Sequence, residues 1–327
     1  MQQEKIIIIG AGPCGIAASI ELNKLGLSPL VIEKASIVNS IYLYPTYMQF
    51  FSTAEKLEIG GVPFTTPNDK PTRIEALTYY RKVAQTHKLR IHQYEEVTSV
   101  VPDVGQFIIE TKPMNGEPRV YRTERVVVAT GYFDNPNMLG IPGEELPKVS
   151  HFFREAHPYT GTKTAIIGGN NSAIDAALEL MRTGADVTVV YRGETYSDNI
   201  KPWVLPTFRS MVEQGRIRMM FRSQVIRINP DSIVVSTPDG DEVMPNDFVL
   251  ALTGFRPDRK FLEKTGVQMD EESDRPVYNP HTMETNVKGL YVAGVVASGR
   301  NANEIFIESG RFHGNLIAEH IRSIMAN

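Results

Sequence analysis

The chain has 327 residues, about twice the usual size of one domain, so we expect two packed domains. Its formal net charge of −4 provides no basic surface for nucleic acid or an anionic membrane, which argues against both as partners. A single cysteine, Cys14, excludes an internal disulfide framework, a CxxC redox pair and any multi-cysteine metal site. The uncharged stretch at 6–20 is shorter than a membrane span and has no basic segment before it. We therefore expect a cytoplasmic protein.

The N-terminus has the pattern of a strand, a glycine turn and a helix. Isoleucines 6–9 predict a buried parallel strand, and residues 16–22 have the spacing of a helix. The three glycines between them each have a separate role. Gly10 allows the tight turn, Gly12 lets a pyrophosphate approach the backbone, and Gly15 lets the helix pack close to the strand. This pattern predicts a dinucleotide site at the start of the helix.

An acidic residue completes this first motif. The short apolar stretch at 30–32 predicts a second strand, and Glu33 follows it, 33 − 15 = 18 residues beyond Gly15. A carboxylate at this distance holds a ribose hydroxyl in dinucleotide-binding folds. The combination of strand, glycines, helix and acid is more specific than the glycines alone.

The same pattern returns in the middle of the chain. A strand at 164–167 leads into Gly168 and Gly169, and a helical segment follows at 174–181. Asn170 replaces the middle glycine and Ala173 the third, so this motif is weaker. The order of strand, turn and helix still predicts a second dinucleotide site.

Arg192 indicates which dinucleotide the second site binds. It follows the strand at 187–190, where a site for NAD would place a carboxylate. An arginine there accommodates a 2′-phosphate, so NADPH is favoured over NADH. The alternative is an ordinary surface arginine after a strand.

The remaining segments indicate how the two sites are connected. Thr72 and Glu75 form a capping-box pattern that opens a helix through Ala84, and 96–101 with 106–111 predict a hairpin. Strands at 126–131 and 248–254, each ending in glycine, bracket the second motif. A last strand at 290–294 leads to a terminal helix at about 303–326.

The predicted fold class is α/β, with two Rossmann-like domains of the three-layer ββα type. We expect a first dinucleotide-binding domain at 1–131 and 257–327, with a second domain at 132–256, for which NADPH is favoured, inserted into it. Gly131 and Gly254 lie at the two connections, where hinges would let the inserted domain rotate.

Five segments give the chain a family resemblance: GAGPCG at 10–15, ATGYFDNP at 129–136, IIGGNNSAIDAA at 166–177, TGFRPD at 253–258 and GLYVAGVV at 289–296. The sequence resembles the flavoprotein reductases related to thioredoxin reductase and, more closely, the bacillithiol disulfide reductase family. The resemblance spans essentially the whole chain, and it implies FAD and NADPH as cofactors.

The resemblance also implies a set of cofactor-binding residues. Near Ile305, the start of the last helix would point its positive end at the flavin. The full set comprises Gly10, Gly12, Pro13, Gly15, Glu33, Lys34, Val97, Ala129, Thr130, Gly131, Gly168, Asn170, Asn171, Ser172, Ala173, Arg192, Gly254, Gly294, Val295 and Ile305.

The sequence departs from these relatives at two places. Val295 stands where related reductases have an aspartate that bonds the ribityl chain. The CxxC that thioredoxin reductases carry before the second glycine motif is also missing, so a protein disulfide cannot be reduced by that route. The resemblance instead implies a low-molecular-weight thiol disulfide, bacillithiol disulfide, as substrate. It further implies a bacilliredoxin-type protein as an indirect partner, and a homo-oligomer.

Cys14 is the candidate nucleophile. Its attack on the disulfide would leave a mixed disulfide that reduced flavin must resolve, because no second cysteine exists. A helix N-terminus lowers a thiol pKa, whereas a bound pyrophosphate raises it, so the sign of the shift stays open. The alternative is a small buried structural residue.

Other candidates are weaker. His151, His157 and His313 could donate a proton near a flavin, although structural roles are commoner. An aromatic-rich stretch could cover the flavin ring or simply pack in the core; it contains Tyr42, Tyr44, Tyr47, Phe50 and Phe51. Four arginines are interpreted as a solvated face: Arg216, Arg218, Arg222 and Arg227.

Three alternative functions remain open at this stage. One is an NADPH reductase for ferredoxin or flavodoxin, which needs no cysteine. Another is a flavin monooxygenase, suggested by the segment at 150–159 before the second motif. The third is a slow redox sensor that binds both dinucleotides.

Overall fold

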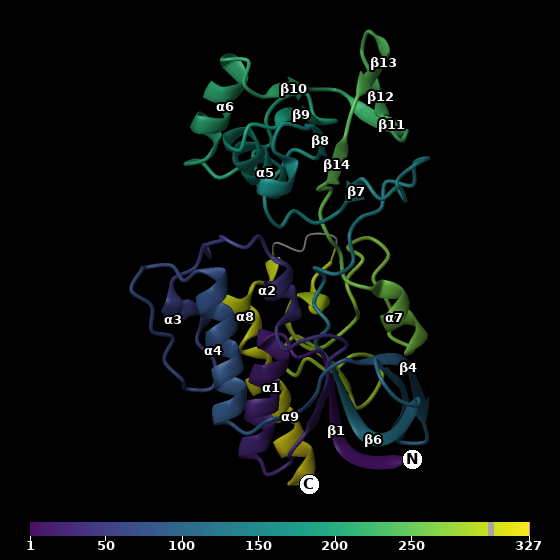
Figure 1. Ribbon diagram of the computed structural model, residues 1–327. Helices are drawn as coiled ribbons and strands as arrows, with labels where there is room; N and C mark the ends of the chain where they lie inside the picture. Colours follow the sequence, from purple (N-terminus) through teal and green to yellow (C-terminus); the bar gives the residue numbers. More distant parts are fainter. Residues whose placement is uncertain (300–303, 327) are drawn as a thin grey trace. The chain divides into compact units, whose positions relative to one another are not determined.

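The computed structural model describes residues 1–299 and 304–326 (Figure 1). The chain divides into two compact units. The first unit contains residues 1–43, 47–135 and 255–327, and the second contains 44–46 and 136–254. In the part of the chain that the structure describes, no helix has the length and apolar character needed to cross a membrane.

The first unit is built on a seven-stranded sheet in the order β3-β2-β1-β6-β5-β4, with β15 also paired to β6. Its strands are β1 (Gln2–Ile9), β2 (Leu30–Ile32), β3 (Arg90–His92), β4 (Glu95–Asp103), β5 (Gln106–Pro113), β6 (Arg119–Val128) and β15 (Leu290–Val292). β1, β2, β3, β6 and β15 pair in parallel, whereas β4, β5 and β6 form an antiparallel meander. The isoleucines of β1 are buried, as expected for a strand covered on both faces.

Register places three strand ends at one edge of this sheet. Val128 of β6 pairs with Ile9 of β1 on one side and with Val292 of β15 on the other. The segments that follow these three residues therefore leave the sheet side by side. In parallel α/β sheets this edge is where ligands bind.

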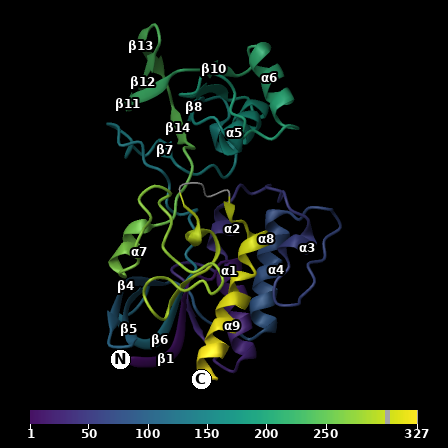
Figure 2. The ribbon, with the colours of Figure 1, turned by 180° about the vertical axis from the view of Figure 1, so that it is seen from behind.

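Helices cover the first unit's sheet. They are α1 (Pro13–Lys24), α2 (Asn39–Leu43), α3 (Ala54–Leu57), α4 (Arg73–Thr86), α7 (Arg259–Lys264), α8 (Ile307–Gly310) and α9 (His313–Met325), with a 3₁₀ turn η2 (Gly294–Ala297). Figure 2 shows α1 and α9 side by side. They approach closely because Gly314 has no side chain: a Cβ there would lie 2.6 Å from the Ala18 Cα.

The second unit contains a parallel sheet in the order β10-β9-β8-β14-β7 and an antiparallel sheet in the order β11-β12-β13. The strands are β7 (Val149–Ser150), β8 (Lys163–Ile167), β9 (Asp186–Val190), β10 (Arg218–Met220), β11 (Gln224–Ile228), β12 (Ser232–Thr237), β13 (Gly240–Pro245) and β14 (Phe248–Ala251). The helices are α5 (Asn171–Arg182) and α6 (Leu205–Glu213), with a 3₁₀ turn η1 (His157–Tyr159). The α/β fold class with two Rossmann-like sheets is confirmed.

Local predictions agree with these elements, with one exception. The capping box of Thr72 and Glu75 opens α4, and the hairpin is β4–β5. The prediction of one continuous terminal helix is wrong, because the described part is broken at Arg311 and Phe312 into α8 and α9. Arg311 donates to the carbonyls of Glu55 and Glu58, which ties this break to the end of α3. The predicted start at Asn303 lies outside the described residues.

Candidate functional site

The first glycine turn connects β1 to α1 and leaves open space in front of the helix. Gly10 has φ +105°, and a Cβ there would lie 2.5 Å from the Ala129 carbonyl oxygen. A Cβ on Gly15 would lie 2.1 Å from the Gly10 carbonyl oxygen, so only glycine fits at these two positions. A Cβ on Gly12 would meet nothing within 4 Å. The turn therefore fits a pyrophosphate at the N-terminus of α1, directly before Pro13.

Glu33 is held rigidly beside this turn. Its side chain accepts hydrogen bonds from the backbone N–H groups of Ala11 at 2.8 Å and Ala35 at 2.9 Å, and the residue is 8% exposed. Burial raises the pKa of the Glu33 carboxyl, although the two N–H donors oppose this shift. Lys34, which follows it, forms an ion pair with Asp134.

Two backbone hydrogen bonds connect Glu33 to the segment at the end of β3 and the start of β4. The Glu33 N–H donates to the His92 carbonyl at 2.8 Å, and the Glu95 N–H donates to the Glu33 carbonyl at 3.0 Å. Val97 lies on β4 in the same segment and is half-buried. The position of Glu33 therefore depends on how the connection from β3 to β4 is anchored.

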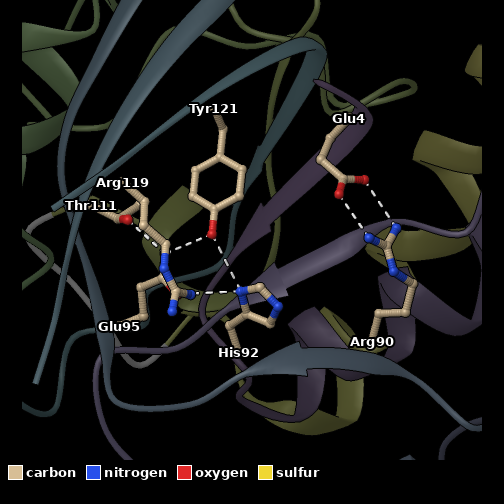
Figure 3. A network of polar contacts seen from close by, with 7 residues as sticks. All are labelled: Glu4, Arg90, His92, Glu95, Thr111, Arg119 and Tyr121. Atoms are coloured by element: carbon tan, nitrogen blue, oxygen red, sulfur yellow. Dashed lines mark hydrogen bonds and ion pairs between the residues drawn. The ribbon is translucent and has the colours of Figure 1, made fainter. Parts of the chain in front are cut away.

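Glu95 provides that anchor (Figure 3). It is 2% exposed and accepts hydrogen bonds from the Thr111 hydroxyl at 2.5 Å, the Tyr121 hydroxyl at 2.8 Å and the Arg119 guanidinium at 2.7 Å. His92 Nδ1 lies 3.2 Å from the same carboxylate. Burial alone would raise the pKa of Glu95, but the donors and the charge of Arg119 outweigh it and hold this pKa below its ordinary value. Sequence reasoning missed this residue; the one available signal is that alternation along β4 turns Glu95 inward.

The carboxyl ends of β1, β6 and β15 bring several predicted residues together. The Ala129 N–H donates to the Ile9 carbonyl, and the Ala293 N–H donates to the Val128 carbonyl. Ala129, Thr130 and Gly131 therefore leave the sheet next to the first glycine turn, with Gly294 on the far side of β6.

Cys14 lies at this meeting point, in the first turn of α1. A Cβ on either Gly294 or Gly310 would lie 2.9 Å from the Cys14 sulfur, so the sulfur packs against both glycines. Ile305 packs against Gly310 from the same side. Burial raises the pKa of the Cys14 thiol to about 12, which makes the thiol neutral at physiological pH.

His313, the first residue of α9, also contacts this cluster. Its Nδ1 accepts a hydrogen bond from the Gly294 N–H at 3.1 Å. Burial lowers the pKa of His313, so the ring is neutral and its proton lies on Nε2. The neighbouring Val295 uses its carbonyl to accept from the N–H and hydroxyl of Ser298, which closes the η2 turn.

The other two candidate histidines, His151 and His157, belong to the second unit. His151 Nε2 lies 3.4 Å from a carboxylate oxygen of the buried Glu144, and His157 is exposed on η1. In the aromatic-rich stretch, Phe50 is buried, whereas Tyr42, Tyr47 and Phe51 are about half exposed, and Tyr44 belongs to the second unit.

The second glycine turn connects β8 to α5. Gly168 has φ +144°, and a Cβ there would lie 2.5 Å from the Leu252 carbonyl oxygen. Asn170 caps α5 through its extended backbone, Ser172 is exposed and Ala173 is buried. Gly254, after β14, has φ +88° and accepts from the Asn137 N–H.

The side chain of Asn171, the first residue of α5, binds a neighbouring loop. Its side-chain amide donates to the Asn199 carbonyl at 2.8 Å and accepts from the Lys201 N–H at 2.9 Å. The residue therefore holds the loop at 199–201 against the start of α5, and its cofactor-binding role stays a prediction.

Each unit has a set of parallel strands, a glycine turn and a following helix, with open space or exposed polar residues at the turn. This arrangement defines a protein that holds two dinucleotides. Residues 7–294 match the family described as pyridine nucleotide-disulphide oxidoreductase. The chain is 52% identical over 323 residues to bacilliredoxin reductase Bdr of Bacillus subtilis (strain 168), covering 98% of each sequence. The chain therefore belongs to the pyridine nucleotide-disulphide oxidoreductase family.

Two solved structures agree with this assignment. Bacillithiol disulfide reductase Bdr (YpdA) from Bacillus cereus matches with a TM-score of 0.97 and 52% identity, over 99% of this chain and 100% of that one. The same protein from Staphylococcus aureus matches with a TM-score of 0.94 and 45% identity, over 99% of both chains. The prediction of a flavoprotein oxidoreductase that uses FAD and a nicotinamide dinucleotide is confirmed.

Proposed function

We propose that the protein uses NADPH to reduce bacillithiol disulfide or a related low-molecular-weight thiol disulfide, so that RSSR + NADPH + H⁺ gives 2 RSH + NADP⁺. The names of the Bacillus and Staphylococcus relatives support this substrate. The thiol product would in turn serve a bacilliredoxin-type protein. A homo-oligomer in the cytoplasm is part of the same proposal.

In this proposal the first unit holds FAD and the second holds NADPH. The open space at Gly12 would take the FAD pyrophosphate, and Glu33 would accept from the ribose. Lys34, Val97, Ala129, Thr130, Gly131, Gly294, Val295 and Ile305 would line the rest of that site. The turn from Gly168 to Ala173 would receive the NADPH pyrophosphate, with Arg192 at the 2′-phosphate and Gly254 at the connection.

The single observation that carries the proposal is the position of Cys14, the chain's one thiol, between Gly294 and Gly310 in the first turn of α1, beside the FAD site that we propose. Bound FAD would accept a hydride from NADPH and supply two electrons to the disulfide. Cys14 would attack one sulfur of RSSR, forming Cys14–S–S–R and releasing RSH. Two electrons and two protons would then cleave this mixed disulfide to the Cys14 thiol and a second RSH.

The neutral Cys14 thiol sets a condition on this route. Because burial raises its pKa to about 12, the thiol must lose its proton as it attacks, rather than wait as a thiolate. His313 lies beside Gly294 and is neutral, and its Nδ1 already accepts a hydrogen bond from the Gly294 N–H.

Single-turnover kinetics test the proposal. NADPH-reduced Cys14→Ala and Cys14→Ser enzymes are mixed with bacillithiol disulfide, and with ferricyanide as an acceptor that needs no thiol. We expect both variants to lose most of their disulfide reduction and to keep the wild-type rate with ferricyanide. Wild-type disulfide rates in both variants would remove Cys14 from the mechanism. Turnover of the wild-type enzyme with ferredoxin or flavodoxin but with no disulfide would reject the proposed substrate class.

A further inference from the structure

Arg222 lies at the same sheet edge as Arg192, although the two are 30 residues apart in the sequence. Strands β9 and β10 are parallel neighbours, and Val190 at the end of β9 pairs with Met220 at the end of β10. Arg192 and Arg222 each lie two residues beyond these paired ends. The carboxyl ends of parallel strands form the ligand-binding edge of such a sheet. The sequence-based interpretation of Arg222 as part of a solvated face did not include this pairing.

Three backbone hydrogen bonds fix Arg222 against the segment that carries Arg192. The Arg222 N–H donates to the Gly193 carbonyl at 2.9 Å, and the Ser223 N–H donates to the Tyr191 carbonyl at 3.1 Å. The Tyr191 N–H donates in turn to the Met220 carbonyl at 2.9 Å. Arg222 also has φ +50°, a left-handed backbone that residues other than glycine rarely adopt. The surrounding hydrogen bonds hold it there.

Tyr191 connects this pair of segments to the second glycine turn. A Cβ on Gly169 would lie 2.3 Å from the Tyr191 ring, and a Cβ on Gly193 would also lie 2.3 Å from it. The ring is therefore packed against both glycines. Because Gly169 belongs to the proposed pyrophosphate site, the segment at 191–193 and Arg222 are held in a fixed position relative to that site.

The side chain of Arg222 is available to a ligand. Its Nε lies 3.8 Å from a carboxylate oxygen of Glu194, and the two side chains are 61% and 77% exposed. An exposed ion pair of this length is weak and exchanges readily for a stronger anion. Arg192 is exposed as well.

We propose that Arg222 is the second guanidinium of the NADPH 2′-phosphate site, acting with Arg192, and that Glu194 is the carboxylate the phosphate displaces from it. Arginine suits this role because its planar donors pair with phosphate oxygens in a bidentate way. The 2′-phosphate is present on NADPH and absent from NADH, so the role of Arg222 depends on NADPH being the electron donor, as proposed above.

The test is direct binding of nucleotide fragments to the FAD-loaded enzyme by titration calorimetry. The probes are 2′,5′-ADP, which carries the 2′-phosphate, and 5′-AMP, which differs from it only in lacking that phosphate. We expect Arg222→Ala to raise the Kd for 2′,5′-ADP about tenfold, which is the loss of one charge-assisted contact, and to change the Kd for 5′-AMP by less than about twofold. Glu194→Gln should lower the Kd for 2′,5′-ADP, because it removes the competing charge.

Two further variants serve as controls. Arg222→Gly relieves the left-handed backbone, so an equal loss of 2′,5′-ADP affinity in the Gly and Ala variants assigns the loss to the guanidinium. Arg227→Ala removes another exposed arginine, on β11, and should leave both Kd values unchanged. Unchanged 2′,5′-ADP binding in both Arg222 variants, or an equal loss for 5′-AMP, overturns the role of Arg222.

The outcome also separates this role from the proposed function. If the wild-type enzyme binds 2′,5′-ADP no more tightly than 5′-AMP and uses NADH as well as NADPH, the choice of NADPH in the proposed function fails. If the wild type prefers 2′,5′-ADP and the Arg222 variants retain that preference, NADPH remains the donor and only the role of Arg222 fails.

Discussion

Removing the buried Glu95 carboxylate should destabilise the first unit strongly. Glu95→Ala leaves the hydroxyls of Thr111 and Tyr121 without their acceptor and Arg119 without its counter-charge. Arg119 is partly exposed, so most of the cost comes from the two buried hydroxyls: each buried polar group that loses its partner costs about 1–3 kcal/mol, and we expect a total of about 3–5 kcal/mol. Glu95→Gln keeps the shape and one acceptor oxygen, so we expect a smaller loss of about 1–3 kcal/mol.

Urea unfolding of the FAD-loaded enzyme measures this cost for each unit. Release of FAD would report on the first unit, and the fluorescence of Trp203, the chain's one tryptophan, reports on the second. With an m-value of about 2 kcal/mol/M, Glu95→Ala should lower the midpoint of FAD release by about 2 M. The Trp203 transition should not move, because its unit is intact.

The matched control is Glu4→Gln, which breaks the Glu4–Arg90 pair on the same sheet (Figure 3). Arg90 is partly exposed there, so the cost should be about 1 kcal/mol or less. The pH dependence gives a second check. Since the pKa of Glu95 is lowered in the folded state, its contribution is present at neutral pH and is lost as the pH falls below about 4.5, the ordinary glutamate value. A Glu95→Ala midpoint equal to that of Glu4→Gln would refute the role of the network.

Three other outcomes follow from the site. Gly12→Ala should fold normally but bind FAD at least about tenfold more weakly. Gly15→Ala should fail to fold, because its Cβ would lie 2.1 Å from the Gly10 carbonyl oxygen. Circular dichroism measures whether each variant folds, and FAD titration measures how tightly it binds the cofactor. Alkylation of Cys14 in the FAD-free protein should accelerate steadily up to pH 10, and a plateau near pH 8 would contradict its raised pKa. The pKa of His313 is lowered in the folded state, so its protonation favours unfolding as the pH falls through about 6.5. The variant His313→Asn keeps an acceptor for the Gly294 N–H, and it should remove this part of the pH dependence of Tm. Equal slopes of Tm between pH 5 and 8 in the two proteins would contradict it.

Short-range patterns were sufficient for the fold class and for both glycine turns. The order of apolar strand, glycines, helix and second strand depends on backbone geometry within about 30 residues, so the segments at 5–33 and 164–192 could be interpreted without any tertiary contact. The capping box at Thr72 is equally local. The same reasoning identified Glu33, because its distance from Gly15 along the chain reflects one strand–helix–strand unit.

Features that depend on burial, or on contacts between distant segments, required the tertiary structure. The thiol of Cys14 is neutral because Gly294 and Gly310, almost 300 residues away, pack against it, and the sequence alone left that sign open. Glu95 is the centre of a hydrogen-bonded network because β5 and β6 place the donors of Thr111, Arg119 and Tyr121 next to it. Tertiary contacts also connect the Asn171 side chain to the loop at 199–201 and place Arg222 beside the segment of Arg192. Hydrogen bonds and desolvation act through space, so the spacing of residues along a chain does not reveal which partners will meet.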